Sequence, residues 1–241
     1  MGRILVPSPT NIMNREAYEL FDDFLHYTDA DLWTQAVVAN GTVTLTDGRS
    51  VIKLFSTTDN DAACLATTTE QFKFVANQAM YAEMRALFAD TATFNTAFCF
   101  GWCDAMAGTT ITAGGDTLTI TNEGAFIWVG AESGATAGVK YQFWTEMDTV
   151  AKNSVATLAP QSTLYQTLAI DIIPVSSTVF EARPFVDGKQ LIDNTSGKPI
   201  MHTITLGTAT DMDFGVVLRG GHADDTSLLI DYLYASQVRG A

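Results

Sequence analysis

The feature that most constrains this chain is a succession of short β-prone segments separated by Asn-Gly and Asp-Gly pairs. Both central residues of a type I′ turn have φ > 0, which Asn, Asp and Gly adopt at low cost. We therefore predict a β-hairpin at each of three such pairs, which are Asn40-Gly41, Asp47-Gly48 and Asp187-Gly188. The first two would make consecutive hairpins from Ala36–Val38, Thr42–Leu45 and Ser50–Phe55. The third would join Phe185-Val186 to Gln190–Ile192.

Further runs rich in Val, Ile, Thr and Phe continue this pattern toward the C-terminus. Such spacing of short strands predicts an all-β sandwich or barrel. Hydrophobic residues make up 47% of the 241 residues and aromatic residues 10%, enough apolar surface for a sizeable core. No repeat or linker divides the chain, so we predict one domain. The runs are Ala97–Phe100, Thr117–Ile120, Ala125–Trp128, Val139–Trp144, Thr167–Ile173, His202–Leu206, Phe214–Leu218 and Leu228–Tyr234.

The N-terminal segment has a different composition. Its two prolines have a fixed φ and no N–H group, which favours an extended course. We predict an extended arm over residues 1–19 and a sandwich domain over residues 20–241. The arm carries an apolar triplet that would be a liability if exposed, so we expect it to contact another copy or a shell protein. The predicted interface residues are Ile4, Leu5, Val6, Pro7 and Pro9.

The segment Asn77–Asp90 is ambiguous. Most of its residues are good helix formers, which favours a helix. With a period of two, however, its Met, Ala and Phe residues fall on one face, and Tyr81 and Arg85 fall on the other. We predict a strand over Tyr81–Phe88.

Six short phrases follow one another along the chain. They are Ala-Glu-Met-Arg at 82–85, Phe-Gly-Trp at 100–102, Gly-Ala-Phe-Ile-Trp at 124–128, Leu-Ala-Ile-Asp at 168–171, Phe-Val-Asp-Gly-Lys at 185–189 and Ile-Asp-Tyr-Leu at 230–233. In this order the chain resembles the concanavalin A-like lectin/glucanase jelly-roll superfamily over roughly residues 20–239, and in particular structural proteins of tailed bacteriophages. The resemblance implies an all-β jelly-roll sandwich of two antiparallel sheets. It also implies a strand at the Glu-x-Arg segment, which is why the strand is preferred to the helix there.

The charge of the chain limits its partners. With 13 basic and 27 acidic side chains, the formal net charge is −14, which opposes binding to nucleic acid or to an anionic membrane surface. No signal peptide or membrane-spanning segment is recognised. The three cysteines, Cys64, Cys99 and Cys103, are predicted to be reduced, buried thiols and not part of a zinc site.

No catalytic residue or cofactor is predicted. Hydrolases of the superfamily carry Glu-x-Asp-x-x-Glu, or a version one residue shorter, on one strand as nucleophile and general acid. The nearest match begins with Glu146 and Asp148, but Val150 and Ala151 stand where the second Glu is needed. Without that proton donor we expect no enzyme. His202 is expected to be a hydrogen-bonded wall residue.

Sugar and calcium binding are weighed as alternatives. Four tryptophans could form a stacking platform on the concave sheet, although each lies in or beside an apolar run that favours core packing. Asp59-Asn60-Asp61 and Asp211-Met212-Asp213 could offer oxygen ligands to calcium, but short acidic turns are more often solvated, so no metal is predicted. The tryptophans are Trp33, Trp102, Trp128 and Trp144.

A virion structural protein fits these features best. We expect a decoration or cement protein, made in the cytoplasm of a bacterial host, on the outside of the capsid. Its partners would be other copies of itself, as a dimer or trimer, and the major capsid protein, because contact is the task of such a protein and symmetric particles favour self-association. The alternative is a carbohydrate-binding, lectin-like module on a tail or fibre.

Overall fold

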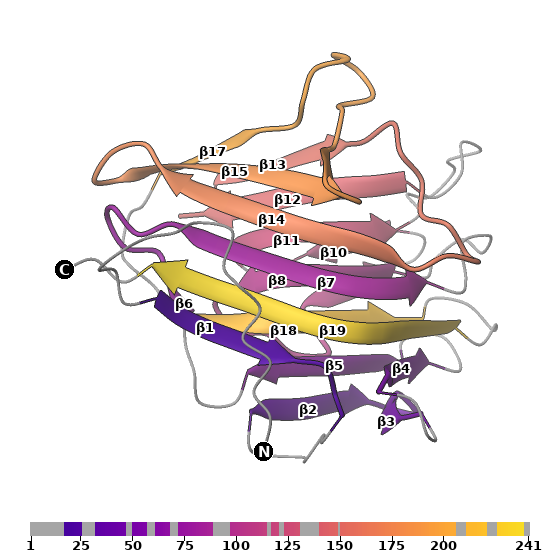
Figure 1. Ribbon diagram of the computed structural model, residues 1–241. Helices are drawn as coiled ribbons and strands as arrows, with labels where there is room; N and C mark the ends of the chain where they lie inside the picture. Colours follow the sequence, from indigo (N-terminus) through magenta and orange to yellow (C-terminus); the bar gives the residue numbers. More distant parts are fainter. Residues whose placement is uncertain are drawn as a thin grey trace.

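The computed structural model is an antiparallel β-sandwich (Figure 1). It describes residues 17–25, 32–46, 50–56, 61–67, 72–88, 97–114, 117–120, 123–130, 140–148, 150–205, 211–220 and 226–238. These ranges hold nineteen strands, and no helix within them is long and apolar enough to cross a membrane. The predicted all-β sandwich is therefore confirmed.

One layer is a nine-stranded sheet with the closing strand of the chain near its centre. All its strand pairs are antiparallel. In spatial order the strands are β16 (Lys189–Gln190), β15 (Val179–Val186), β14 (Gln166–Pro174), β7 (Met80–Phe88), β19 (Thr226–Val238), β4 (Ile52–Ser56) and β3 (Thr42–Leu45), with β1 (Ala17–Asp22) also on β19 and β17 (His202–Thr205) also on β15.

The other layer is an eight-stranded sheet, and a separate two-stranded hairpin accompanies it. Its order is β13 (Val150–Val155), β12 (Lys140–Met147), β11 (Gly124–Gly130), β8 (Ala97–Cys103), β18 (Asp211–Arg219), β5 (Ala62–Thr67) and β2 (Trp33–Val38), with β6 (Phe72–Lys73) also on β18. The hairpin consists of β9 (Ile111–Gly114) and β10 (Thr117–Ile120).

The ambiguous segment is a strand, as predicted. In β7 every second residue from Met80 to Phe88 is buried, and the residues between them face outward. The strand pairs with β14 on one side and β19 on the other. Helix propensity differs between residues by less than about 1 kcal/mol each, so two flanking strands and a buried face override it.

The three hairpin predictions have different outcomes. Asp187 and Gly188 have φ of 50° and 72° and close the β15–β16 hairpin as predicted. The pairing of β3 with β4 is also confirmed, although residues 47–49 lie outside the described residues. The prediction at Asn40-Gly41 is wrong, because β2 pairs with β5 in one sheet and β3 pairs with β4 in the other.

The chain therefore changes sheets at Asn40-Gly41. Gly41 donates its N–H to the carbonyl of Val38 at 3.1 Å, and a Cβ atom placed on Gly41 would lie 1.9 Å from the carbonyl oxygen of Ala62. The glycine is required by this close approach of two backbones, not by a hairpin turn.

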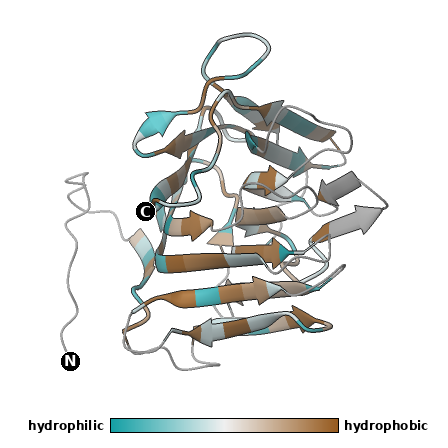
Figure 2. Ribbon diagram, turned by 90° about the vertical axis from the view of Figure 1, so that its right-hand side faces the viewer, coloured by the Kyte–Doolittle hydropathy of each residue, from teal (hydrophilic) through white to brown (hydrophobic). Residues whose placement is uncertain are grey.

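The main core lies between the sheets and is rich in aromatic rings. Phe214 is at its centre, with ring centroids 5.7 Å from Phe100, 6.0 Å from Trp102 and 6.2 Å from Trp33. Edge and tilted arrangements of this kind add to the stabilisation that burial gives. Figure 2 shows bands of hydrophobic and hydrophilic colour along many of the strands, as expected where one side of a strand faces this core.

The N-terminal boundary differs from the predicted one. Residues 17–19, assigned to the arm, belong to β1, which pairs with β19 from Ala17↔Val238 to Asp22↔Leu233. Leu20 on β1 is buried, and Tyr18 packs against Phe72 with ring centroids 5.2 Å apart. The predicted interface residues Ile4, Leu5, Val6, Pro7 and Pro9 lie outside the described residues.

Candidate functional site

The four tryptophans divide into two pairs. Trp33 and Trp102 are buried between the sheets, as the core interpretation predicts. Trp128 on β11 and Trp144 on β12 instead lie with the smaller apolar cluster on the outer face of the eight-stranded sheet. Two of the four candidates for sugar binding are thus brought together.

Most of that outer face is covered. Side chains of β5, β8, β11 and β18 form a second apolar cluster with Ile111 and Ile120 of the β9–β10 hairpin and with Met106. Burial on both faces explains why all residues of β5, β8 and β11 are buried. The cover is incomplete at β12 and β13, where Trp144 is half-buried and Asn153 is exposed.

At this open edge, four side chains form what we call the Trp–amide patch: Trp128, Gln142, Trp144 and Asn153. The Trp128 Nε1 donates to Asn153 Oδ1 at 3.3 Å, and Asn153 Nδ2 donates to Gln142 Oε1 at 2.8 Å. Gln142 Nε2 in turn donates to the carbonyl of Gly130 at 3.2 Å. The exposed amide of Asn153 is therefore held in place by buried partners.

Trp144 is central to the patch. It pairs across the sheet with Phe126 on β11 and with Asn153 on β13. Its Nε1 atom is buried and has no hydrogen-bond partner among the described residues. An unpaired buried donor of this kind costs about 1–3 kcal/mol.

The carboxylates of the partial hydrolase motif lie near the patch. Glu146 is on β12, but Asp148 lies beyond the strand, in a turn with φ of 49°. Both line a shallow pocket of about 240 Å³ between the β12–β13 turn and β17, together with Val150 and Lys152. The pKa of Glu146 is raised, mainly by burial and to a smaller extent by the negative charges of Glu123 and Asp104.

His202 is a buried wall residue, as predicted. Its Nδ1 lies 2.9 Å from Thr145 Oγ1, and its Nε2 lies 2.9 Å from Ser154 Oγ. Burial and the nearby Lys152 lower its pKa to about 4, against an opposing effect of Asp193. The imidazole is therefore neutral at pH 7 and joins β17 of one sheet to β12 and β13 of the other.

The three cysteines are buried and carry no disulfide, in agreement with the predicted buried thiols. Burial raises the pKa of all three thiols, that of Cys103 to about 12. Thiols held in this protonated state are poor nucleophiles and metal ligands.

In the acidic segments weighed as calcium sites, Asp211 and Asp213 each have other partners. Asp211 forms an ion pair with Lys73 at 3.0 Å, and Asp213 Oδ2 accepts the N–H of Met106 at 3.3 Å. Asp59 and Asn60 lie outside the described residues. Among the residues that the structure describes, no group of three or more His, Cys, Asp or Glu side chains is arranged to hold a metal ion.

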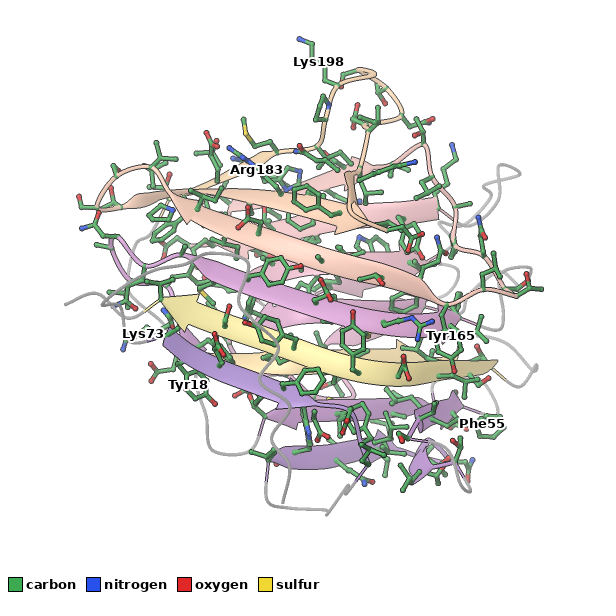
Figure 3. The ribbon with its side chains drawn as sticks, viewed as in Figure 1. Tyr18, Phe55, Lys73, Tyr165, Arg183 and Lys198 are labelled. Carbon is green, nitrogen blue, oxygen red and sulfur yellow. The ribbon has the colours of Figure 1, made fainter. Side chains whose placement is uncertain are left out.

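Sequence reasoning missed a second surface, the outer face of the nine-stranded sheet. Five of its side chains form what we call the tyrosine face: Phe21, Tyr81, Glu83, Tyr232 and Tyr234. They come from β1, β7 and β19, and Figure 3 views this side of the molecule. The alternation along β7 and β19 was the available signal, because a strand with one buried face exposes its other residues.

Comparisons with known proteins identify the fold. No family model and no curated protein matches the sequence. The carbohydrate recognition domain of Emp47p is similar in structure, with a TM-score of 0.60 and 11% identity over 93% of this chain and 96% of that one. An endo-1,3-β-glucanase from Streptomyces sioyaensis gives 0.53 and 14% over 97% and 99%.

A phage protein is also among the similar structures. The CBM2 module of the evolved Dit of Lactobacillus casei BL23 phage J-1 gives a TM-score of 0.52 and 10% identity over 95% of this chain and 99% of that one. The similar structures are mostly lectin-like and carbohydrate-recognition domains. The chain thus has the concanavalin A-like jelly-roll fold that the sequence phrases implied.

Proposed function

We propose that this protein is a lectin-like saccharide-binding domain, and that the Trp–amide patch is its binding site. The observation that carries the proposal is the position of Trp144, a half-buried ring beside the exposed amide of Asn153, which its bonds to Trp128 and Gln142 hold in place. An apolar surface bordered by a few placed polar groups is the usual composition of a small-ligand site.

The chemistry of the patch suits a sugar ring. A pyranose presents C–H groups on its faces and hydroxyl groups on its rim, so it needs an apolar platform and hydrogen-bonding groups beside it. An indole ring supplies a large, rigid apolar surface. An amide supplies both donors and acceptors, and Asn153 retains hydrogen-bonding capacity beyond its bonds to Trp128 and Gln142.

A binding function is preferred to catalysis. Glycoside hydrolysis needs two carboxyl groups placed as acid and as nucleophile or base across one glycosidic bond. Here Glu146 and Asp148 share a shallow pocket, but the position of the missing second Glu is taken by Val150 or Ala151. Turnover of a soluble β-1,3-glucan that disappears in Glu146→Gln would contradict this preference.

Saccharide binding is compatible with a place on a virion. The role of capsid decoration, with self-association and contact to the major capsid protein through the N-terminal arm, stays a prediction from the sequence and its resemblance. A saccharide-binding domain on a particle would serve attachment to a surface glycan, whereas a pure cement protein has no need of saccharide selectivity.

The test is a glycan array followed by titration calorimetry with the best saccharide. We expect selective binding that falls at least tenfold in Trp144→Ala and in Asn153→Ala. Asn153 is exposed, so the second variant should keep the fold even if the first does not. Tyr234→Ala, on the opposite sheet, is the matched aromatic control and should bind normally. A uniformly negative array, or equal loss in the control, would overturn the proposal.

A further inference from the structure

The tyrosine face presents carboxylates among aromatic rings. Tyr81 Oη donates to Glu83 Oε2 at 2.5 Å, and Tyr232 Oη donates to Glu83 Oε1 at 2.5 Å. The rings of Tyr81 and Tyr234 lie 6.0 Å apart, as do those of Phe21 and Tyr232. Glu83 is thus held between two tyrosines, and no basic side chain among the described residues forms an ion pair with it.

The surroundings of this face are acidic. Outward-facing acidic side chains are Glu19, Glu83, Asp171, Glu181 and Asp231, whereas the outward-facing basic side chains are Arg85, Arg183 and, on the neighbouring strand β4, Lys53. Each of these arginines already has an acidic partner, since Arg85 pairs with Asp231 and Arg183 pairs with Glu181. The face therefore keeps an excess of negative charge at its centre, in a chain of net charge −14.

The same surface shows how it can hold a guanidinium group. Arg85 forms an ion pair with Asp231, and its guanidinium carbon lies 5.0 Å from the centroid of the Tyr165 ring. Figure 3 labels Tyr165 at the end of this sheet and Arg183 over β15. A guanidinium group combines a two-pronged bond to a carboxylate with stacking on an aromatic ring, which an ammonium group cannot match.

We propose that the tyrosine face is a docking surface for a basic protein partner, and that it takes an arginine side chain onto Glu83 between the tyrosine rings. Each oxygen of a carboxylate has two lone pairs, so Glu83 can accept a guanidinium fork in addition to its two tyrosine donors. The tyrosine hydroxyl groups fix the carboxylate in advance, which lowers the entropic cost of binding. Tyrosine and arginine are also the residues that dominate the binding energy of protein interfaces.

This docking surface is independent of the saccharide site. The tyrosine face belongs to the nine-stranded sheet and the Trp–amide patch to the eight-stranded sheet, with the aromatic core between them. The two proposals can therefore fail separately.

The probe is a fluorescein-labelled hexa-arginine peptide, measured by fluorescence anisotropy against the full chain. We expect binding that weakens with salt, at least threefold tighter than that of hexa-lysine. Glu83→Gln should weaken it about tenfold, and Tyr234→Ala should weaken it at least threefold while leaving thermal unfolding cooperative. The matched control is Asp148→Asn, which removes the same charge from an exposed turn and suits its φ of 49°.

Equal weakening in Asp148→Asn and Glu83→Gln would show diffuse attraction to a polyanion and overturn the proposal. Equal affinity for hexa-arginine and hexa-lysine, or no binding of either peptide at low salt, would also overturn it. The two variants of the tyrosine face, Glu83→Gln and Tyr234→Ala, should leave the affinity for the saccharide unchanged.

Discussion

The outer faces of the two sheets differ in how far other parts of the chain cover them. On the eight-stranded sheet, the β9–β10 hairpin and Met106 cover the middle of an apolar face, and the edge at β12 and β13 stays open. On the nine-stranded sheet, charged and aromatic side chains alternate with core residues, and the face has no such cover among the described residues. The same fold thus offers a narrow, shielded site on one side and a broad, polar surface on the other.

The difference teaches where each kind of recognition is possible. A covered face leaves room only for a small ligand at its edge, where buried groups can fix the exposed ones. An open face has room for a macromolecule, and its ion pairs are exposed to solvent and salt. Four measurements on the unfolding and reactivity of the protein test this contrast.

The largest expected effect is protection of the thiols. Cys64, Cys99 and Cys103 lie in the main part of the covered face and have raised pKa values, so a thiol reagent should reach them only after the sheet opens. We expect labelling at pH 8 to be slower than in guanidinium chloride by a factor of roughly 10³ or more. Thr44→Cys, on an exposed strand, should label at once. Rapid labelling of the native wild-type protein would show that this face does not shield the three thiols.

The second-largest effect is expected from a core substitution on the covered face. Phe126 is fully buried on β11, so Phe126→Ala should lower the free energy of unfolding by about 3–5 kcal/mol in urea titration. The control is Phe21→Ala on the tyrosine face, where the side chain is 42% exposed, and a loss of about 1 kcal/mol or less is expected. Similar losses in both variants would remove the distinction between the two faces.

The third effect is a dependence of stability on pH through His202. Its folded pKa of about 4 lies below the value of 6.5 for an unperturbed imidazole, so the unfolded chain binds more protons between these limits. The stability contributed by the neutral imidazole is present above pH 6.5 and is lost as the pH falls toward 4, by on the order of 3 kcal/mol.

The measurement is urea unfolding of the wild type and of His202→Gln at intervals from pH 7 to pH 4.5. The difference between the two proteins isolates the imidazole, because the carboxylates titrate in both. Asp22, Asp171 and Asp213 have raised pKa values, so their protonation acts in the opposite direction, and the comparison cancels it. If the difference in the free energy of unfolding between the two proteins did not change with pH, His202 would not be the source of the pH dependence.

The smallest effect is expected on the open face. Arg85 and Asp231 form an exposed ion pair, with side chains 44% and 32% exposed. Arg85→Met should change the free energy of unfolding by less than about 1 kcal/mol, and the change should shrink further in 0.5 M salt. A loss of several kcal/mol that persists in salt would mean that the pair is shielded like the covered face.

The sequence predicted strands well where one face is buried. The period of two over Tyr81–Phe88, together with the family resemblance, indicated β7 against the local helix propensity, and Asp187-Gly188 indicated a hairpin because the turn chemistry is contained in two residues. It did not predict β5, whose Ala-rich run Ala62–Thr67 is buried on both faces and shows no alternation. The hairpin prediction at Asn40-Gly41 is wrong because the same dipeptide also suits a point where the chain passes from one sheet to the other.

For the candidate sites, the sequence supplied residue types but not their faces. It named four tryptophans and favoured the core for all of them, which is right for Trp33 and Trp102 in the main core and for Trp128 in the smaller apolar cluster, whereas Trp144 is only half-buried. Whether Trp128 and Trp144 meet Asn153 depends on the pairing of β11, β12 and β13, a register that residue pattern alone does not give. The tyrosine face likewise combines β1, β7 and β19, which are far apart in the chain.

What the sequence by itself determined is therefore local: the turns, the strands with alternating burial, the acidic charge, the lack of a complete hydrolase motif and, through ordered phrases, the jelly-roll fold. The tertiary structure decided which strand lies beside which, and so which side chains share a face. Strand pairing is a long-range contact, set by the burial of whole faces at once, and the two proposed sites exist only after that pairing is made.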